Sequence, residues 1–229
     1  AQAMLAKVYA EKEVQDYDKV ITYADKVIKT TGVELEDSYE TLWGYDETTK
    51  DCLKRITKEV ILEVQWTTGS GNWETWMYGR QLDNWDYYFT WAKWITPSRD
   101  IINDFEKEGD EIRKNQAIVY YACTWSNYYP ASNYPFMYKL RSSYSNIYWI
   151  RLADIILMKA EAEAYKGNHD ESAKLVNQIR KPAKLKELTS DKTNSKEAMI
   201  EAVLHERRLE LAFEGERWFD LCRYNKVEK

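Results

Sequence analysis

The segment 205–221, HERRLELAFEGERWFDL, places eight acidic or basic residues beside His205. Clustered acids and bases are what proton transfer at a catalytic cleft requires. A general acid that works at neutral pH needs a carboxyl group with a raised pKa, whereas neighbouring guanidinium groups keep carboxylates ionised. The mixture of arginines and glutamates in this charged segment therefore argues against catalysis.

The spacing in the charged segment favours a structural role instead. Arg207, Glu210, Glu214 and Arg217 follow one another at intervals of three, four and three residues, which makes them neighbours on a helix surface. We expect them to form a structural network along one long helix that begins at about residue 195. Because a desolvated network is costly to break, alanine at Glu210 or Arg217 is expected to lower stability and to leave ligand affinity unchanged.

The same helix is expected to present an apolar face to the core. At 100° per residue this face contains Ile200, Leu204, Leu211 and Trp218, and Ser195 is placed to cap the first turn.

Two helical hairpins are expected to support this helix. Apolar residues at intervals of three and four predict helices over about 1–13 and 16–31, with Gly32 as the stop. A second pair is expected within 148–182, and its first helix should end at Gly167. Small residues and turn residues coincide when the two pairs are aligned, as in tetratricopeptide-like repeats.

The residues between the hairpins follow different sequence patterns. The alternating residues of EVILEVQW predict a strand over 59–66, and TTGSGN over 67–72 is typical of a turn. A short helix is expected after Pro97, followed by an irregular tyrosine-rich stretch over 120–148.

Composition excludes several classes of function. The 229 residues carry a net charge of -5 with no dense basic cluster, which argues against a nucleic-acid partner. Three cysteines and two histidines share no ligand spacing, so neither a metal nor another cofactor is expected. No apolar run approaches the length of a membrane span, and the N-terminus has no signal-peptide pattern.

Aromatic residues are concentrated in segment 66–94, which contains ten of them among amides and charged residues. An indole packs against the C–H face of a sugar, while amide, carboxylate and guanidinium groups suit its hydroxyls. We expect ligand binding by Asn72, Trp73, Trp76, Tyr78, Arg80, Asn84, Trp85 and Tyr87. The alternative is that most of these rings are core anchors, with Trp66 and Trp94 the clearest core members.

A second aromatic group has two alternative interpretations, as an extension of the binding face or as part of the core. It comprises Trp125, Tyr128, Tyr129, Tyr134, Phe136 and Tyr138.

Several motifs, in order along the chain, carry a family resemblance. IRLADIILMKAEAEAYKGN, LVNQIR and ERRLELAFEGERWFDL resemble the C-terminal half of the SusD/RagB family of outer-membrane nutrient-binding lipoproteins. The resemblance implies a mainly α fold with tetratricopeptide-like pairs and aromatic-rich insertions that have little β structure. It implies one SusD-like domain fragment over 1–229, with a helical hairpin (1–48), a strand and insertion (49–148), and a second hairpin plus the long C-terminal helix (149–229).

The resemblance also implies a function without catalysis. Such a protein captures an oligo- or polysaccharide, or another nutrient, at the cell surface and passes it to a SusC-like TonB-dependent transporter. It would be a surface-exposed lipoprotein of the outer membrane whose only membrane attachment, an N-terminal lipid anchor, is missing from this chain.

Two other functions remain open from the residues. A glycoside hydrolase would need two carboxylates roughly 5–9.5 Å apart across a cleft, for which Asp83 and Asp86 are the candidates. A tetratricopeptide-like module would bind a protein in its helical groove, although the apolar run 150–158 indicates a helix that is buried in its own fold.

Overall fold

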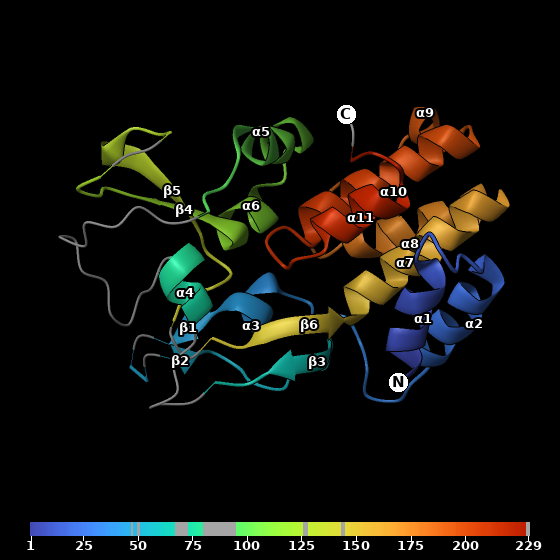
Figure 1. Cartoon of the computed structure of the whole chain (residues 1–229), viewed down its shortest axis with the longest axis horizontal. Helices are drawn as coiled ribbons and strands as arrows, with labels where there is room; N and C mark the ends of the chain where they lie inside the picture. Colours follow the sequence, from blue (N-terminus) through green and yellow to red (C-terminus); the bar gives the residue numbers. More distant parts are fainter. Residues whose placement is uncertain are drawn as a thin grey trace. The chain divides into compact units, whose positions relative to one another are not determined.

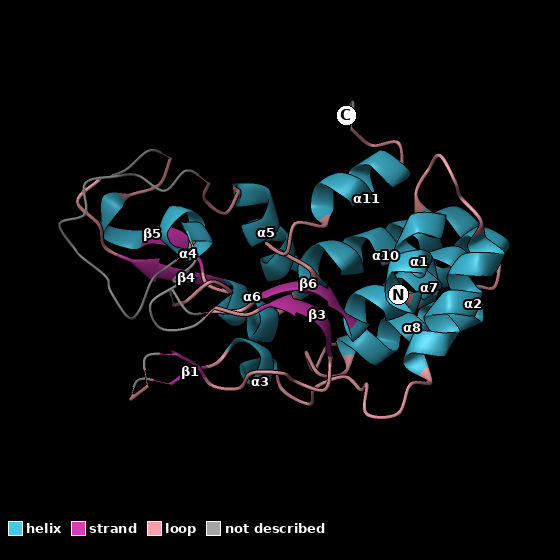
Figure 2. Cartoon of the chain, turned by 60° about the horizontal axis from the view of Figure 1, so that its bottom comes forward, coloured by secondary structure: helices cyan, strands magenta, loops and turns pink. Residues whose placement is uncertain are grey.

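The computed structural model describes residues 1–46, 48–49, 51–66, 73–79, 95–125, 128–142 and 145–227. The fold is mainly α with short strands, as the resemblance implied (Figures 1 and 2). The chain forms two compact units, each built from separate stretches. The helical unit comprises Ala1–Asp37, Lys58–Leu62 and Tyr148–Lys229, and the mixed unit comprises Ser38–Thr57 and Glu63–Ile147. The single domain expected over 1–229 stays a prediction.

The helical unit contains both predicted hairpins. Its helices are α1 (Gln2–Ala10), α2 (Tyr17–Ile28), α7 (Leu152–Lys166), α8 (His169–Arg180), α9 (Ser190–Thr193), α10 (Lys196–Glu210) and α11 (Arg217–Arg223). Helix α2 packs against α1 and α7, and α7 packs against α8 and α10. Just before α7 lies β6 (Ile147–Arg151), which pairs with β3 (Val60–Val64), so the strand predicted at 59–66 is confirmed.

Helix α7 is the centre of the helical unit. Its apolar residues Ile155, Ile156 and Leu157 are fully buried, and they pack with α8 and α10 residues such as Val176 and Val203. The burial predicted for 150–158 is therefore confirmed. Gly167 ends α7 in the left-handed conformation, which glycine adopts at little cost.

The single long helix predicted from residue 195 is wrong beyond Glu210. The chain leaves the helix at Leu211 and starts again at Arg217, and the intervening turn contains two left-handed residues, Phe213 (φ 65°) and Gly215 (φ 88°). The 100° projection assumed a continuous axis, which this turn breaks. As a result, Trp218 is not on the buried face and is 59% exposed.

The mixed unit contains more regular structure than the sequence predicted. Its elements are α3 (Tyr39–Trp43), β1 (Tyr45–Asp46), β2 (Asp51–Cys52), α4 (Trp73–Tyr78), α5 (Arg99–Glu108), α6 (Glu111–Ala117), β4 (Ile118–Tyr121), the 3₁₀ turn η1 (Ala131–Asn133) and β5 (Tyr134–Met137). Strand β1 pairs with β2 and β4 with β5, both antiparallel. The helix expected after Pro97 is α5, capped by Ser98 and closed by Gly109.

The prediction of an irregular stretch over 120–148 is wrong where β4 pairs with β5. The pairing runs from Ile118 opposite Met137 to Tyr121 opposite Tyr134. All four residues of β5, YPFM, are buried, so this strand lacks the alternation that marks a half-buried strand. A proline at position 135 also counts against a strand in sequence-based analysis.

The cap predicted at Ser195 offers a test of local stability. Its Oγ accepts a hydrogen bond from Ala198 N at 3.1 Å. Replacing Ser195 with Ala is expected to lower the free energy of unfolding by about 0.5–2 kcal/mol, since that amide loses its acceptor. Urea unfolding measures the change, and Ser190→Ala, at an exposed serine nearby, is the control. Equal effects of the two changes would contradict the capping role.

Candidate functional site

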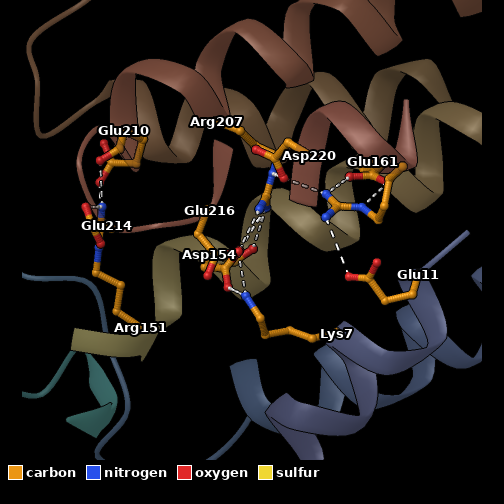
Figure 3. A network of polar contacts seen from close by, with 11 residues as sticks. Lys7, Glu11, Arg151, Asp154, Glu161, Arg207, Glu210, Glu214, Glu216 and Asp220 are labelled. Carbon is orange, nitrogen blue, oxygen red and sulfur yellow. Dashed lines mark hydrogen bonds and ion pairs between the residues drawn. The ribbon is translucent and has the colours of Figure 1, made fainter. Parts of the chain in front are cut away.

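The charged segment 205–221 is distributed over three elements. Arg207 and Glu210 lie on α10, Glu214 and Glu216 lie in the turn that follows, and Arg217 is the first residue of α11. Because the helix is interrupted, these residues do not form the predicted line along one helix. Arg207, Glu210 and Glu214 instead bind partners from other parts of the helical unit (Figure 3).

The first centre of this network is Arg151, at the end of β6, which is 1% exposed. Its Nη1 donates to Glu210 Oε1 and to Glu59 Oε1, both at 2.7 Å. Its Nε donates to Glu214 Oε2 at 2.7 Å and its Nη2 to Glu214 Oε1 at 2.9 Å, a bidentate pair. The Nη2 group also donates to the carbonyl oxygen of Glu210 at 2.8 Å, so one guanidinium holds the start of α7, the end of α10 and the turn together.

The second centre is Asp154, in the first turn of α7. Its Oδ1 lies 2.9 Å from Arg207 Nη1, and its Oδ2 accepts a hydrogen bond from Lys7 Nζ at 2.6 Å. Lys7 also donates to Glu216 Oε2 at 2.8 Å, and Arg207 Nε donates to Asp220 Oδ1 at 2.9 Å. Figure 3 shows that the Lys7 side chain reaches this centre from α1 and the Arg207 side chain reaches it from α10.

The network continues to Arg223 on α11. Its Nη2 donates to Asp220 Oδ1 at 2.7 Å and to Glu161 Oε2 at 2.8 Å. Asp220 therefore bridges Arg207 and Arg223, and α11 is bound to α10 and α7 through buried charges.

The pKa shifts in the network differ in direction from one carboxyl group to the next. Burial alone would raise the pKa of the Asp154 carboxyl, but Lys7 and Arg207 outweigh it and hold that pKa well below its usual range. Burial raises the pKa of Glu59 and of Glu216 despite their cationic neighbours. Each carboxylate that faces an arginine here is bound by it, so the segment that most resembles a catalytic site is occupied by internal contacts.

The sequence analysis missed most members of this network, among them Lys7, Arg151, Asp154 and Asp220. One signal was present, because Arg151 and Asp154 stand at the start of the apolar run in IRLADIILM. Charged residues in a helix that is otherwise buried on all sides must find partners. Their partners lie far away in the chain, and no local pattern identifies them.

The candidate ligand residues lie largely outside the described residues. This holds for Asn72, Arg80, Asn84, Trp85 and Tyr87, and for the side chains of Trp73 and Trp76, whose backbone belongs to α4. The side chain of Tyr78 is half-buried. The next residue, Gly79, bridges to Met137, and a Cβ atom there would lie 2.2 Å from the carbonyl oxygen of Leu140, so glycine is required where α4 ends.

The second aromatic group contributes to a core. Tyr134 and Phe136 are buried with Cys123, and Trp125 packs edge-on against both rings at centroid distances of 4.7 and 6.0 Å. Tyr128 is the exposed member, at 68%.

Three further observations on the described residues bear on function. No group of three or more histidine, cysteine or acidic residues among them could hold a metal ion. None of the described helices combines the length and apolar character needed to cross a membrane. A small hollow of the helical unit is lined by Tyr148, Trp149, Arg151, Asp154, Leu211, Glu214 and Glu216.

Residues 124–229 match the model of the SusD family. A curated relative, SusD-like protein P38 of Formosa agariphila, is 43% identical over 89 residues, which cover 36% of this chain and 18% of that protein. The resemblance stated from the sequence motifs is confirmed.

Solved structures show that the chain has the SusD fold. A SusD-like carbohydrate binding protein from Bacteroides vulgatus matches 97% of this chain and 44% of its own, with a TM-score of 0.73 and 18% identity. Surface glycan-binding protein A from Bacteroides thetaiotaomicron matches 99% of this chain and 55% of its own, with a TM-score of 0.72 and 16% identity. The chain thus spans about half the length of these solved relatives.

Proposed function

We infer that this chain, which has the SusD fold and whose residues 124–229 belong to the SusD family, binds a glycan or another nutrient and does not transform it. The observation that carries this proposal is the fold match. Two proteins with the same fold over nearly the whole chain are described as a carbohydrate binding protein and a surface glycan-binding protein.

The buried network supports binding without catalysis. The acids and bases of the charged segment that resemble catalytic groups are engaged inside the helical unit, where Arg151 alone contacts three carboxylates. Asp154, which Lys7 and Arg207 hold in the ionised form, is a poor proton donor at neutral pH.

The ligand site that we propose is the aromatic segment around Trp73, Trp76, Trp85 and Tyr87. Its flat rings offer faces for sugar C–H groups, and Asn72, Tyr78, Arg80 and Asn84 offer polar partners for hydroxyls. Within this segment the structure describes α4, which carries Trp73 and Trp76 and ends just before the closely packed Gly79.

We further propose that the protein acts at the surface of the outer membrane. The SusD family resemblance supports a role as a lipoprotein that passes its ligand to a SusC-like TonB-dependent transporter. Attachment to the membrane would use an N-terminal lipid anchor.

The test is calorimetry of the full-length protein against plant, host and fungal polysaccharides, with released reducing ends measured in the same samples. Binding without release supports the proposal. Release of reducing ends overturns the non-catalytic assignment and favours the hydrolase alternative with Asp83 and Asp86. Absence of binding to the whole panel overturns glycan as the ligand.

Replacing Trp85 with Ala is expected to weaken glycan binding at least about tenfold, since a central tryptophan often carries a large share of binding energy. The melting temperature should stay at the wild-type value if the ring is exposed. Calorimetry with the best polysaccharide of the panel measures the affinity, and Trp218→Ala, at an exposed tryptophan of the helical unit, is the control. A large fall in melting temperature would place Trp85 in the core.

A further inference from the structure

Tyr128 is exposed although it belongs to an aromatic group that is otherwise largely packed. Its side chain is 68% exposed, whereas Tyr134 and Phe136 are buried in the core of the mixed unit. A tyrosine combines an apolar ring with a polar hydroxyl group, and for that reason it is common where a protein surface meets a binding partner. The exposed ring of Tyr128 is therefore available to a ligand.

The backbone at Tyr128 is held by the start of α5. Arg99, the first residue of α5, donates a hydrogen bond from Nη2 to the carbonyl oxygen of Tyr128. The hydroxyl group of Tyr129 donates to the carbonyl oxygen of Pro97 at 2.7 Å, and its ring packs edge-on against Tyr134 at a centroid distance of 5.8 Å. These contacts to α5 and to the core give the exposed ring a rigid support.

Two exposed charged residues beside this ring have unused hydrogen-bonding capacity. The guanidinium carbon of Arg99 lies 5.0 Å from the centre of the Tyr129 ring, and of its five N–H groups one donates to Tyr128. Asp100 follows in the first turn of α5, and within the part of the chain that the structure describes its carboxylate has no hydrogen-bond or ion-pair partner. Arg99 thus offers donors and Asp100 offers acceptors.

A further tyrosine, Tyr120 of β4, belongs to the same surface and is 36% exposed. Burial raises the pKa of the Tyr129 hydroxyl, and the nearby Arg99 guanidinium partly offsets this effect. Tyr120 and Asp100 also lie near enough to that hydroxyl to raise its pKa. Rings, a donor and an acceptor therefore lie together. This combination suits a sugar, because each sugar hydroxyl can both donate and accept a hydrogen bond.

We propose that Tyr128, Arg99 and Asp100 form a subsite for a sugar ring on the surface of the mixed unit, separate from the aromatic segment 66–94. The sugar stacks on the ring of Tyr128, and its hydroxyls accept from Arg99 and donate to Asp100. This inference rests on the proposed glycan-binding function and adds a second contact point for a polysaccharide.

The experiment compares Tyr128→Ala with Trp218→Ala in the full-length protein. Both changes remove an aromatic ring that is more than half exposed, but Trp218 lies on α11 of the helical unit. Maltoheptaose, cellohexaose and mannohexaose, together with the polysaccharide panel, are titrated by calorimetry. For a ligand that wild type binds, Tyr128→Ala is expected to weaken binding about tenfold, whereas Trp218→Ala changes neither affinity nor melting temperature.

Two conservative variants test the ring and the carboxylate separately. Tyr128→Phe keeps the stacking face and loses only the hydroxyl, so it should bind more tightly than Tyr128→Ala. Asp100→Asn keeps the shape of the side chain but replaces one acceptor oxygen with a donor, so it should weaken binding about fivefold. Because both side chains are exposed, both variants should melt close to wild type.

The possible outcomes separate the subsite from the proposed function. Unchanged affinity of Tyr128→Ala, with Trp85→Ala impaired, overturns the subsite and leaves the proposed function standing. Equal losses of affinity in Tyr128→Phe and Tyr128→Ala overturn stacking on this ring. A fall in the melting temperature of Tyr128→Ala, with full affinity in Asp100→Asn, assigns Tyr128 to the fold and overturns the subsite. Absence of binding by wild type overturns the proposed function and the subsite together.

Discussion

Replacing Arg151 with Met is expected to lower the free energy of unfolding by about 3–5 kcal/mol, the usual effect of removing one partner from a buried ion pair. The variant keeps most of the apolar stem but leaves Glu59, Glu210 and Glu214 without the guanidinium that all three contact. The three carboxylates would then have to be protonated, hydrated or rearranged. Urea unfolding of the wild type and the variant at pH 7 measures the loss.

The control for this change is Lys174→Met. Lys174 is 79% exposed and lies 3.6 Å from Glu171, so its loss removes a positive charge from the surface. Exposed pairs of this kind contribute about 0–1 kcal/mol. If Arg151→Met cost no more than Lys174→Met, the buried network would not be what holds the turn after α10 in place.

Replacing Asp154 with Asn is expected to lower the free energy of unfolding at pH 7 by about 1.5–3 kcal/mol, the contribution of a hydrogen bond to a charged group. The amide keeps the shape of the side chain but loses the charge that faces Lys7 and Arg207. Those two cations would then rely on Glu216 and Asp220 for charge balance.

The Asp154→Asn variant should also change the pH dependence of stability. The pKa of Asp154 is lowered in the folded protein from a usual value near 3.8, so its carboxylate stabilises the fold above that value. This stabilisation is lost as the pH falls towards the lowered pKa. The difference between wild type and variant should therefore shrink by about 1 kcal/mol between pH 7 and pH 3.

Two neighbouring groups act in the opposite direction. Burial raises the pKa of Glu59 and Glu216, so their ionisation opposes folding at neutral pH and their protonation relieves that cost on acidification. Both are present in wild type and variant, and removal of the Asp154 charge should lower the pKa of Glu216. Asp18→Asn, at an exposed partner of Lys166, is the control. A difference between wild type and Asp154→Asn that grows on acidification would contradict the assigned role of Asp154.

The candidate ligand site shows the limit of sequence-based analysis. Composition alone marked segment 66–94 as rich in rings and polar groups, but it could not rank those rings by exposure. In the second aromatic group Tyr134 is buried and Tyr128 is 68% exposed, although both are tyrosines in one short stretch. Exposure depends on which distant residues pack against a ring, as in the pairing of β4 with β5.

The sequence by itself determined the helical hairpins, the strand at Val60–Val64, the cap at Ser195 and the family resemblance. Periodicity and capping act over a few residues of the chain, and the order of the family motifs is visible in the sequence itself. Only the tertiary structure decided which charges pair, because Arg151 meets Glu59 across 92 positions and Glu210 across 59. The contacts of Arg151 with Glu214 and of Arg207 with Asp220 depend on the turn that contains Phe213 and Gly215, and helical spacing cannot show that a helix stops there.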